Sequence, residues 1–252
     1  MEPASSEPIP SDPASVIPIV LIHGAGAVGQ IWQHQLLAFP RAVAPDLPGH
    51  PAGAALSTVP DLARWLLAFL DEDARRRPAP GGASGWVVGG YSLGGAVAME
   101  AALTAPERFR GLILIGTGAR LRVRQEFFDL LAADSEAAVE ELLRWWFAPG
   151  AAPRVVERTR TALRAVSPAV IHDDFWAAHR YDAMDRVGGI ALPTLIICGE
   201  EDRMAPVKYS EYLHGRIGAS QLVVVPGAGH MVVVEQPRAV NEAIAAFLRR
   251  LA

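Results

Sequence analysis

The feature that most constrains the fold is a glycine-rich segment at residues 90–95, with the sequence GYSLGG. It fits the pattern G-x-S-x-G, and it directly follows an apolar run at residues 86–91 and precedes a stretch of small apolar helix formers. A strand that turns sharply into a helix strains the backbone of the central Ser92 and lifts its hydroxyl clear of the sheet. Side chains at Gly90 and Gly94 would collide with neighbouring backbone. The segment predicts a nucleophilic serine, with a structural glycine-rich turn as the alternative.

Apolar runs and amphipathic stretches alternate along most of the chain. Helical spacing of apolar residues is found between the strand-like runs and again at the C-terminus. Alternating strands and helices form a parallel sheet covered on both faces. The sequence therefore predicts an α/β fold with a doubly wound, mostly parallel sheet. The expected strands are residues 16–22, 41–44, 86–91, 111–115, 194–198 and 222–225.

The segment between the strands that end near residue 115 and begin near residue 194 is too long for one crossover helix. Its aromatic residues are interleaved with Arg and Glu in an amphipathic helical pattern. We predict a helical cap at residues 120–186, inserted into a core made of residues 16–119 and 187–252. A separate second domain is the alternative, although so short a segment makes a marginal core alone. Residues 1–15 are rich in Pro, Ser and acidic residues, which predicts a flexible tail.

A serine nucleophile needs a general base, and the chain has seven histidines. His230 follows the last apolar strand, so it is expected at the same carboxyl edge of the sheet as Ser92. Asp202 follows the preceding strand, and the order Ser, acid, His is typical of hydrolases with a nucleophile elbow. We predict His230 as the base and Asp202 as its orienting acid, with Glu200 and Glu201 as alternatives to Asp202.

A second glycine-rich segment, residues 23–26 with the sequence HGAG, follows the first strand. Small residues let backbone approach a ligand, so the amides of Ala25 and Leu93 are predicted to bind an oxyanion. A plain turn is the alternative. We expect His23 to be structural and Asp46 to cap a turn. His50 lies in a loop and receives no role from the sequence; the other histidines, His34, His172, His179 and His214, are expected at the surface or in packing.

The formal net charge of −4 argues against a nucleic-acid binder, which needs a basic face. No apolar run approaches the ~20 residues of a membrane span, and the first residues do not form a signal-peptide pattern. The single cysteine, Cys198, lies in an apolar run and is expected to be buried and inert. We expect a cytoplasmic protein without cofactor or metal, since no dinucleotide fingerprint, phosphate loop or metal-ligand cluster is visible.

Taken together, these motifs resemble those of α/β-hydrolase fold 1 proteins, which include carboxylesterases, enol-lactonases and carbon–carbon bond hydrolases. The resemblance covers nearly all of residues 16–252. The chain has no room for the family's opening β-hairpin before residue 16, which implies six strands instead of eight. Tyr91 and Met231 stand where carbon–carbon hydrolases often have Asn and Trp. The matching segments are residues 23–26, 46–50, 90–95, 199–202, 229–230 and 235–237.

The resemblance and the residues together predict a hydrolase of carboxylic esters that acts through an acyl-enzyme. The expected partner is a small to medium, largely apolar ester, and the aromatic cap suggests its pocket. A carbon–carbon hydrolase or lyase, a lactonase and a non-catalytic ligand receptor remain open, and the oligomeric state is not indicated. The candidate pocket residues are Gly24, Tyr91, Trp146, Trp176 and Met231.

Overall fold

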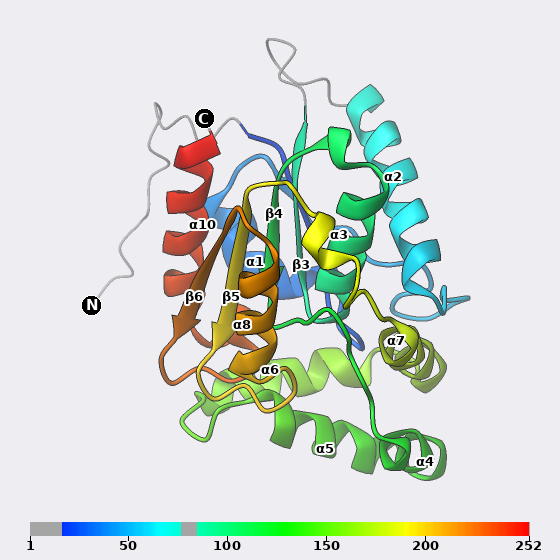
Figure 1. Cartoon of the computed structure of the whole chain (residues 1–252). Helices are drawn as coiled ribbons and strands as arrows, with labels where there is room; N and C mark the ends of the chain where they lie inside the picture. Colours follow the sequence, from blue (N-terminus) through cyan, green and yellow to red (C-terminus); the bar gives the residue numbers. More distant parts are fainter. Residues whose placement is uncertain (1–16, 77–84, 252) are drawn as a thin grey trace.

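The computed structural model describes residues 17–76 and 85–251. Six strands form one sheet in the order β2-β1-β3-β4-β5-β6, and all neighbouring pairs are parallel (Figure 1). The predicted doubly wound α/β fold is thus confirmed, while the predicted tail at residues 1–15 lies outside the described residues. The strands are β1 (Ile19–Ile22), β2 (Ala42–Val43), β3 (Trp86–Tyr91), β4 (Phe109–Ile115), β5 (Thr194–Gly199) and β6 (Ser220–Val225).

The strand ends differ from the prediction where hydrogen bonding, not hydrophobicity, decides them. β1 begins at Ile19, because Pro18 has no N–H to donate; its carbonyl accepts from the Val87 amide at 2.9 Å. β6 begins two residues before the predicted position, because Ser220 continues the register opposite Thr194 in β5. Polar side chains are tolerated at that point because β6 is an edge strand and is mostly half-buried.

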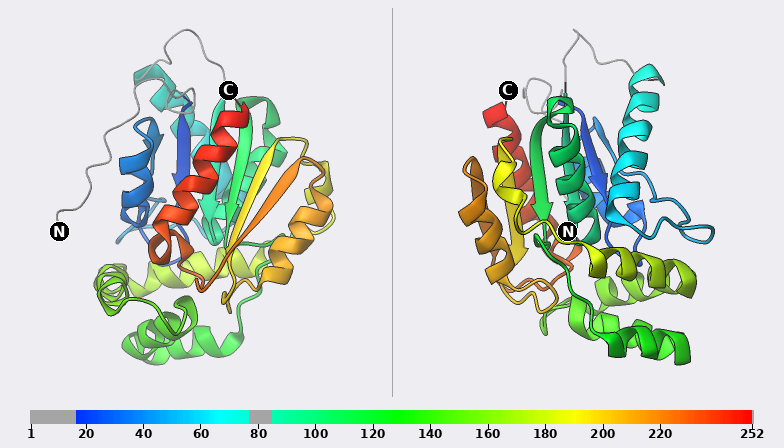
Figure 2. Two further views of the ribbon diagram at one scale, coloured as in Figure 1. Left: turned by 90° about the vertical axis from the view of Figure 1, so that its left-hand side faces the viewer. Right: turned by 45° about the vertical axis from the view of Figure 1, so that its right-hand side comes forward.

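Helices cover both faces of the sheet (Figures 1 and 2). The short α1 packs against α10 on one face, and α2 packs against α3 on the other. The predicted apolar stripe of the last helix is buried through Val240, Ile244, Phe247 and Leu248. No helix within residues 17–76 and 85–251 has the length and apolar character needed to cross a membrane. The bounds are α1 (Gln33–Ala38), α2 (Val59–Arg76), α3 (Leu93–Thr104), α8 (Val207–Arg216), α9 (Val232–Glu235) and α10 (Pro237–Leu251), with 3-10 turns at Gly29–Trp32, Pro106–Arg108 and Val187–Gly189.

Four helices between β4 and β5 lie across the end of the sheet at which the strand arrows point (Figure 1). The chain leaves and re-enters the sheet at neighbouring strands. Arg120 and Asp182 form an isolated antiparallel bridge, and the Ala183 amide donates to the Ala119 carbonyl at 2.8 Å. The two connections to these helices therefore run side by side. The helices are α4 (Gln125–Ala133), α5 (Ser135–Trp146), α6 (Pro153–Arg164) and α7 (Pro168–Arg180).

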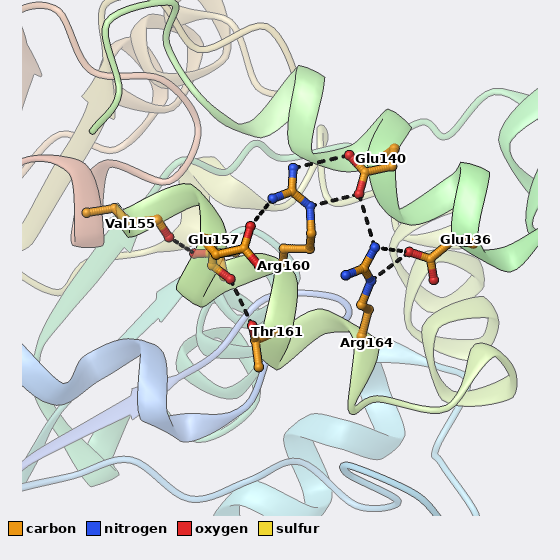
Figure 3. Close-up of polar contacts among 8 residues, drawn as sticks. Glu136, Glu140, Val155, Glu157, Arg160, Thr161 and Arg164 are labelled. Atoms are coloured by element: carbon orange, nitrogen blue, oxygen red, sulfur yellow. Dashed lines mark hydrogen bonds and ion pairs between the residues drawn. The ribbon is translucent and has the colours of Figure 1, made fainter. Parts of the chain in front are cut away.

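Helices α5 and α6 are joined by charged side chains (Figure 3). The Arg160 guanidinium binds Glu140, with Nε 2.8 Å from Oε1, and also Glu157. Arg164 binds Glu136 and lies close to Glu140. The hydrogen bond from Arg160 lowers the pKa of Glu140. Exposed pairs of this kind add little to stability, and their main effect is to align the two helices.

Candidate active site

Ser92 lies on the sharp turn between β3 and α3. Its φ of 54° and ψ of −118° are strained, and it is the one non-glycine residue with positive φ within the described ranges. A Cβ atom at Gly90 would lie 2.0 Å from the Gly94 carbonyl oxygen, and one at Gly94 would lie 2.2 Å from that of Ile22. The expectation that both positions must be glycine is confirmed. The turn is possible only because two backbone segments approach each other this closely.

Gly94→Ala is expected to lower the melting temperature by about 5 °C or more, because its methyl group would have to displace β1 backbone. Gly215→Ala is the matched control: it lies on α8, and a Cβ atom there would meet nothing within 4 Å. The control should leave stability unchanged or raise it by up to ~1 kcal/mol, since alanine favours a helix. Thermal unfolding measures both, and an unchanged Gly94→Ala protein would contradict the tight turn.

The structure brings Ser92, Asp202 and His230 together from three separate loops. His230 Nε2 lies 3.1 Å from Ser92 Oγ, and His230 Nδ1 lies 2.8 Å from Asp202 Oδ2. Asp202 also accepts backbone N–H groups through Oδ1, from Met204 at 2.9 Å and Ala205 at 2.8 Å. Asp202 and His230 are buried. A carboxylate that accepts a hydrogen bond from Nδ1–H leaves the Nε2 lone pair for the serine hydroxyl, which is the arrangement a general base requires.

The alternative acids lie elsewhere. Glu200 and Glu201 are exposed, and the Glu200 carboxylate accepts the Gly227 amide at 3.2 Å.

Glu235 fixes the loop that carries His230. Its two carboxylate oxygens accept the amides of Gly229 and Ala148, each at 3.0 Å. The Met231 amide donates to the Trp146 carbonyl at 3.0 Å, so the same loop is tied a second time to the end of α5. Burial raises the pKa of Glu235, and the two backbone donors oppose that rise. The sequence offered Glu235 only as part of a family motif, without this role.

The second glycine-rich segment, residues 23–26, lies beside the serine. Ala25 lines the same small cavity as Ser92 and His230, and Leu93 is the first residue of α3. Gly26 has a φ of 66°, and the Ala27 amide donates to the Gly24 carbonyl at 3.2 Å, which closes a tight turn. The backbone at residues 25 and 93 thus flanks the nucleophile, as the oxyanion hypothesis requires.

His23 does not line that cavity and has the structural environment expected from the sequence. Its Nε2 accepts the Leu47 amide at 2.9 Å, and its Nδ1 lies 2.9 Å from the Gly24 carbonyl. A ring nitrogen that accepts an N–H carries no proton, so the imidazole is neutral. Burial lowers the pKa of His23 to about 3, which agrees with the geometry. Asp46 accepts the Gly29 amide at 2.6 Å and so caps a turn.

The cavity at Ser92 has a volume of about 50 Å³. A second cleft of about 460 Å³ is lined by residues of α6 and by the segment from Gly26 to the start of α1. None of the five candidate pocket residues lines the first cavity; Trp146 and Met231 line the second. The cavity at Ser92 is lined by Ala25, Ser92, Leu121, Arg122, Val123, Phe175, Ala178, Met204, Ala205, Tyr209 and His230.

The remaining candidates are used in packing. The Tyr91 ring lies 5.0 Å from that of His230, and a Cβ atom at Gly24 would lie 2.8 Å from the Tyr91 ring. Trp176 stacks between His172 and His179. Its neighbour Phe175 faces the serine instead, because successive side chains on a helix point about 100° apart.

Proteins of similar sequence include esterases. The chain is 31% identical over 238 residues to a pimeloyl-[acyl-carrier protein] methyl ester esterase of Neisseria meningitidis serogroup B, covering 87% of this chain and 88% of that protein. A component of the acetoin cleaving system of Pseudomonas putida, a dihydrolipoyllysine-residue acetyltransferase, is 30% identical; the match spans 92% of this chain but 64% of that longer protein.

Among solved structures, a thermophilic esterase superposes with a TM-score of 0.81 at 35% identity, covering 93% of this chain and 90% of that one. The model of the alpha/beta hydrolase family matches residues 19–243, which include the whole sheet and every residue of the candidate site. The chain therefore belongs to the alpha/beta hydrolase family.

Proposed function

We propose that this protein is a serine hydrolase of carboxylic esters and needs no cofactor. The observation that carries the proposal is the continuous hydrogen-bonded connection from Ser92 Oγ through His230 to Asp202. The esterases among its relatives and structural neighbours support the same reaction class. On this proposal, residues 120–186 act as the cap that encloses a small-molecule ester over the serine.

The reaction follows from the positions of these groups. Ser92 Oγ attacks the ester carbonyl carbon while His230 Nε2 takes the hydroxyl proton. Asp202 holds the imidazole in the required tautomer and stabilises the imidazolium. The amides of Ala25 and Leu93 bind the oxyanion of the tetrahedral intermediate. His230 then gives its proton to the departing alcohol, and a water activated by the same nitrogen releases the acid and restores the serine.

The cavity volume limits the substrate. A space of about 50 Å³ at Ser92 holds only a few water-sized groups, and its walls from Leu121, Val123 and Phe175 are apolar. We therefore expect the highest kcat/KM for p-nitrophenyl esters with short acyl chains, and a decline as the chain lengthens. Phe175→Ala enlarges the cavity and should move the optimum to longer chains. Trp176→Ala, on the same helix but outside this cavity, is the matched control and should leave the optimum unchanged.

A substrate panel tests the reaction class. The purified protein is expected to hydrolyse short p-nitrophenyl esters and to react covalently with a fluorophosphonate. The same triad stabilises a tetrahedral oxyanion in carbon–carbon hydrolysis, so a 2-hydroxy-6-oxo-dienoate belongs in the panel. Much faster turnover of that dienoate than of any ester would replace the proposal with a carbon–carbon hydrolase. Binding of esters without turnover would replace it with a receptor.

A further inference from the structure

A buried carboxylate on the cap reaches the predicted oxyanion loop. Asp174 lies on α7 and is 1% exposed. Its Oδ2 accepts the amide of Gly26 at 2.8 Å and also lies 2.9 Å from His50 Nε2. These contacts join residues that are 148 and 124 positions apart in the chain. One oxygen on a cap helix thus binds both the loop beside Ser92 and a histidine of the core.

His50 is held in a defined protonation state by its partners. Its Nδ1 lies 3.1 Å from the Leu47 carbonyl, and its Nε2 faces the Asp174 carboxylate. The Leu47 carbonyl accepts hydrogen bonds, as does the Asp174 carboxylate, so this geometry favours a ring with protons on both nitrogens. Burial raises the pKa of Asp174, and its hydrogen bonds with His50 and Gly26 oppose that rise. Burial by itself lowers the pKa of His50, but the hydrogen bond to Asp174, its negative charge and the backbone carbonyls of Leu47 and Pro48 together raise it.

The two neighbouring histidines complete a closed path of hydrogen bonds. The rings of His23 and His50 lie 4.6 Å apart in an edge-to-face contact. Neutral His23 forms hydrogen bonds with the Gly24 carbonyl and the Leu47 amide. His50 forms hydrogen bonds with the Leu47 carbonyl and the Asp174 carboxylate. The same carboxylate accepts the Gly26 amide. The residue enclosed between the two anchored glycines is Ala25. The peptide groups on both sides of it are therefore fixed.

A second contact docks the same cap helix on the same part of the core. The Ser167 amide, at the N-terminus of α7, donates to the Pro51 carbonyl at 2.9 Å. The helix is thus bound to residues 47–51 near its first residue and again at Asp174, one and a half to two turns later. This double attachment holds the Asp174 carboxylate at a constant position relative to Gly26.

We propose that Asp174, supported by His50, is a positioning residue that fixes the oxyanion loop from the cap, so that the amide of Ala25 is correctly aimed only when α7 is docked. The inference rests on the proposed function, because it assigns Ala25 as an oxyanion donor. Donors aimed in advance at the developing charge stabilise the transition state more than the bound ester. Loss of Asp174 should therefore lower kcat with little change in KM.

The test compares Asp174→Ala and Asp174→Asn, with Asp173→Ala as the matched control. Asp173 is the preceding residue on α7, where it is partly exposed and lies 3.2 Å from His172. Turnover of a short p-nitrophenyl ester is expressed per active site titrated with a fluorophosphonate, so that misfolded molecules are not counted. Asp174→Ala is expected to lose at least ~10-fold in kcat, with KM within ~3-fold of the original.

Asp174→Asn separates positioning from simple packing. An amide oxygen in place of Oδ2 can accept from both Gly26 and His50, so this variant should recover most of the kcat lost in Asp174→Ala. Hydrogen exchange of the peptide spanning residues 22–32 should accelerate in the Ala variant and much less in the Asn variant. Asp173→Ala should match the original protein in both measurements.

Three results would overturn the proposal: an unchanged kcat per titrated site in Asp174→Ala, an Asn variant as slow as the Ala variant, or an equal loss in Asp173→Ala. Failure of the proposed function gives a different result, since the unmodified protein would then turn over the dienoate far faster than any ester, or bind esters without turnover.

Discussion

Ser92→Ala is expected to abolish covalent labelling by a fluorophosphonate and to reduce ester turnover by at least ~10³-fold. The reason is geometric: the Ser92 hydroxyl lies at the start of α3, 3.1 Å from the His230 nitrogen that would deprotonate it. Removing the hydroxyl leaves the imidazole without a nucleophile to activate. Labelling followed by intact-protein mass spectrometry, together with turnover of a short ester, measures both effects.

Ser210→Ala is the matched control. Ser210 is also a buried serine, but it lies on α8 and does not line the cavity at Ser92. The Ser210→Ala variant should react with the fluorophosphonate and hydrolyse the short ester at the same rate as the original protein. Persistent stoichiometric labelling of Ser92→Ala would show that another residue is the nucleophile.

His230→Ala is expected to be about as damaging as Ser92→Ala, because the serine and its base act as one unit. Asp202→Asn should be milder, with a loss of about 10²-fold or more, since catalysis survives in part when only the orienting acid is changed. The Asn side chain retains an oxygen for the amides of Met204 and Ala205, so the loop should keep its shape. The fall in turnover of Asp202→Asn then measures how much catalysis depends on the orientation and charge stabilisation of the His230 imidazole.

Glu200→Gln is the control for the acid, because Glu200 is an exposed carboxylate two residues from Asp202 that binds the Gly227 amide. It should have nearly unchanged kcat. If Glu200→Gln strongly lowered kcat while Asp202→Asn left it unchanged, the acid would be Glu200. The hydrogen bond between Asp202 and His230 would then have no catalytic role.

The strand–turn–helix around Ser92 could be predicted because local sequence determines it. Residues 86–91 form β3 with the bounds expected from their apolar run, and a Cβ atom at Gly90 would meet the Gly94 backbone of the same turn. The contact of Gly94 with Ile22 of β1 is not local, but the G-x-S-x-G pattern already requires a small residue there. The order of Ser92, Asp202 and His230 along the chain also carries geometric information, since parallel strands bring their carboxyl ends to one edge. These features need no knowledge of side-chain packing.

The cap residues near the serine could not be predicted in the same way. Phe175 and Trp176 are adjacent large aromatics, and which of them faces Ser92 depends on how α7 is rotated over the core. His50 and Asp174 meet across 124 residues of chain. One signal was available: Asp174 lies within the apolar stripe of α7, between Ile171 and Ala178, where an unpaired carboxylate would be costly.

The side-by-side connections at Ala119 and Ala183 have a consequence for how this chain can vary. Because the inserted helices leave and rejoin the sheet at adjacent strands, their ends are already joined by a short backbone bridge. A segment with neighbouring ends can be exchanged or lengthened at little cost in loop-closure entropy, because the core between those ends does not change. The four helices thus form a replaceable cassette. If these helices are replaced by those of a relative, the new segment must supply an acceptor for the Gly26 amide. Without one, the loop at residues 23–26 would lose its attachment to the inserted helices.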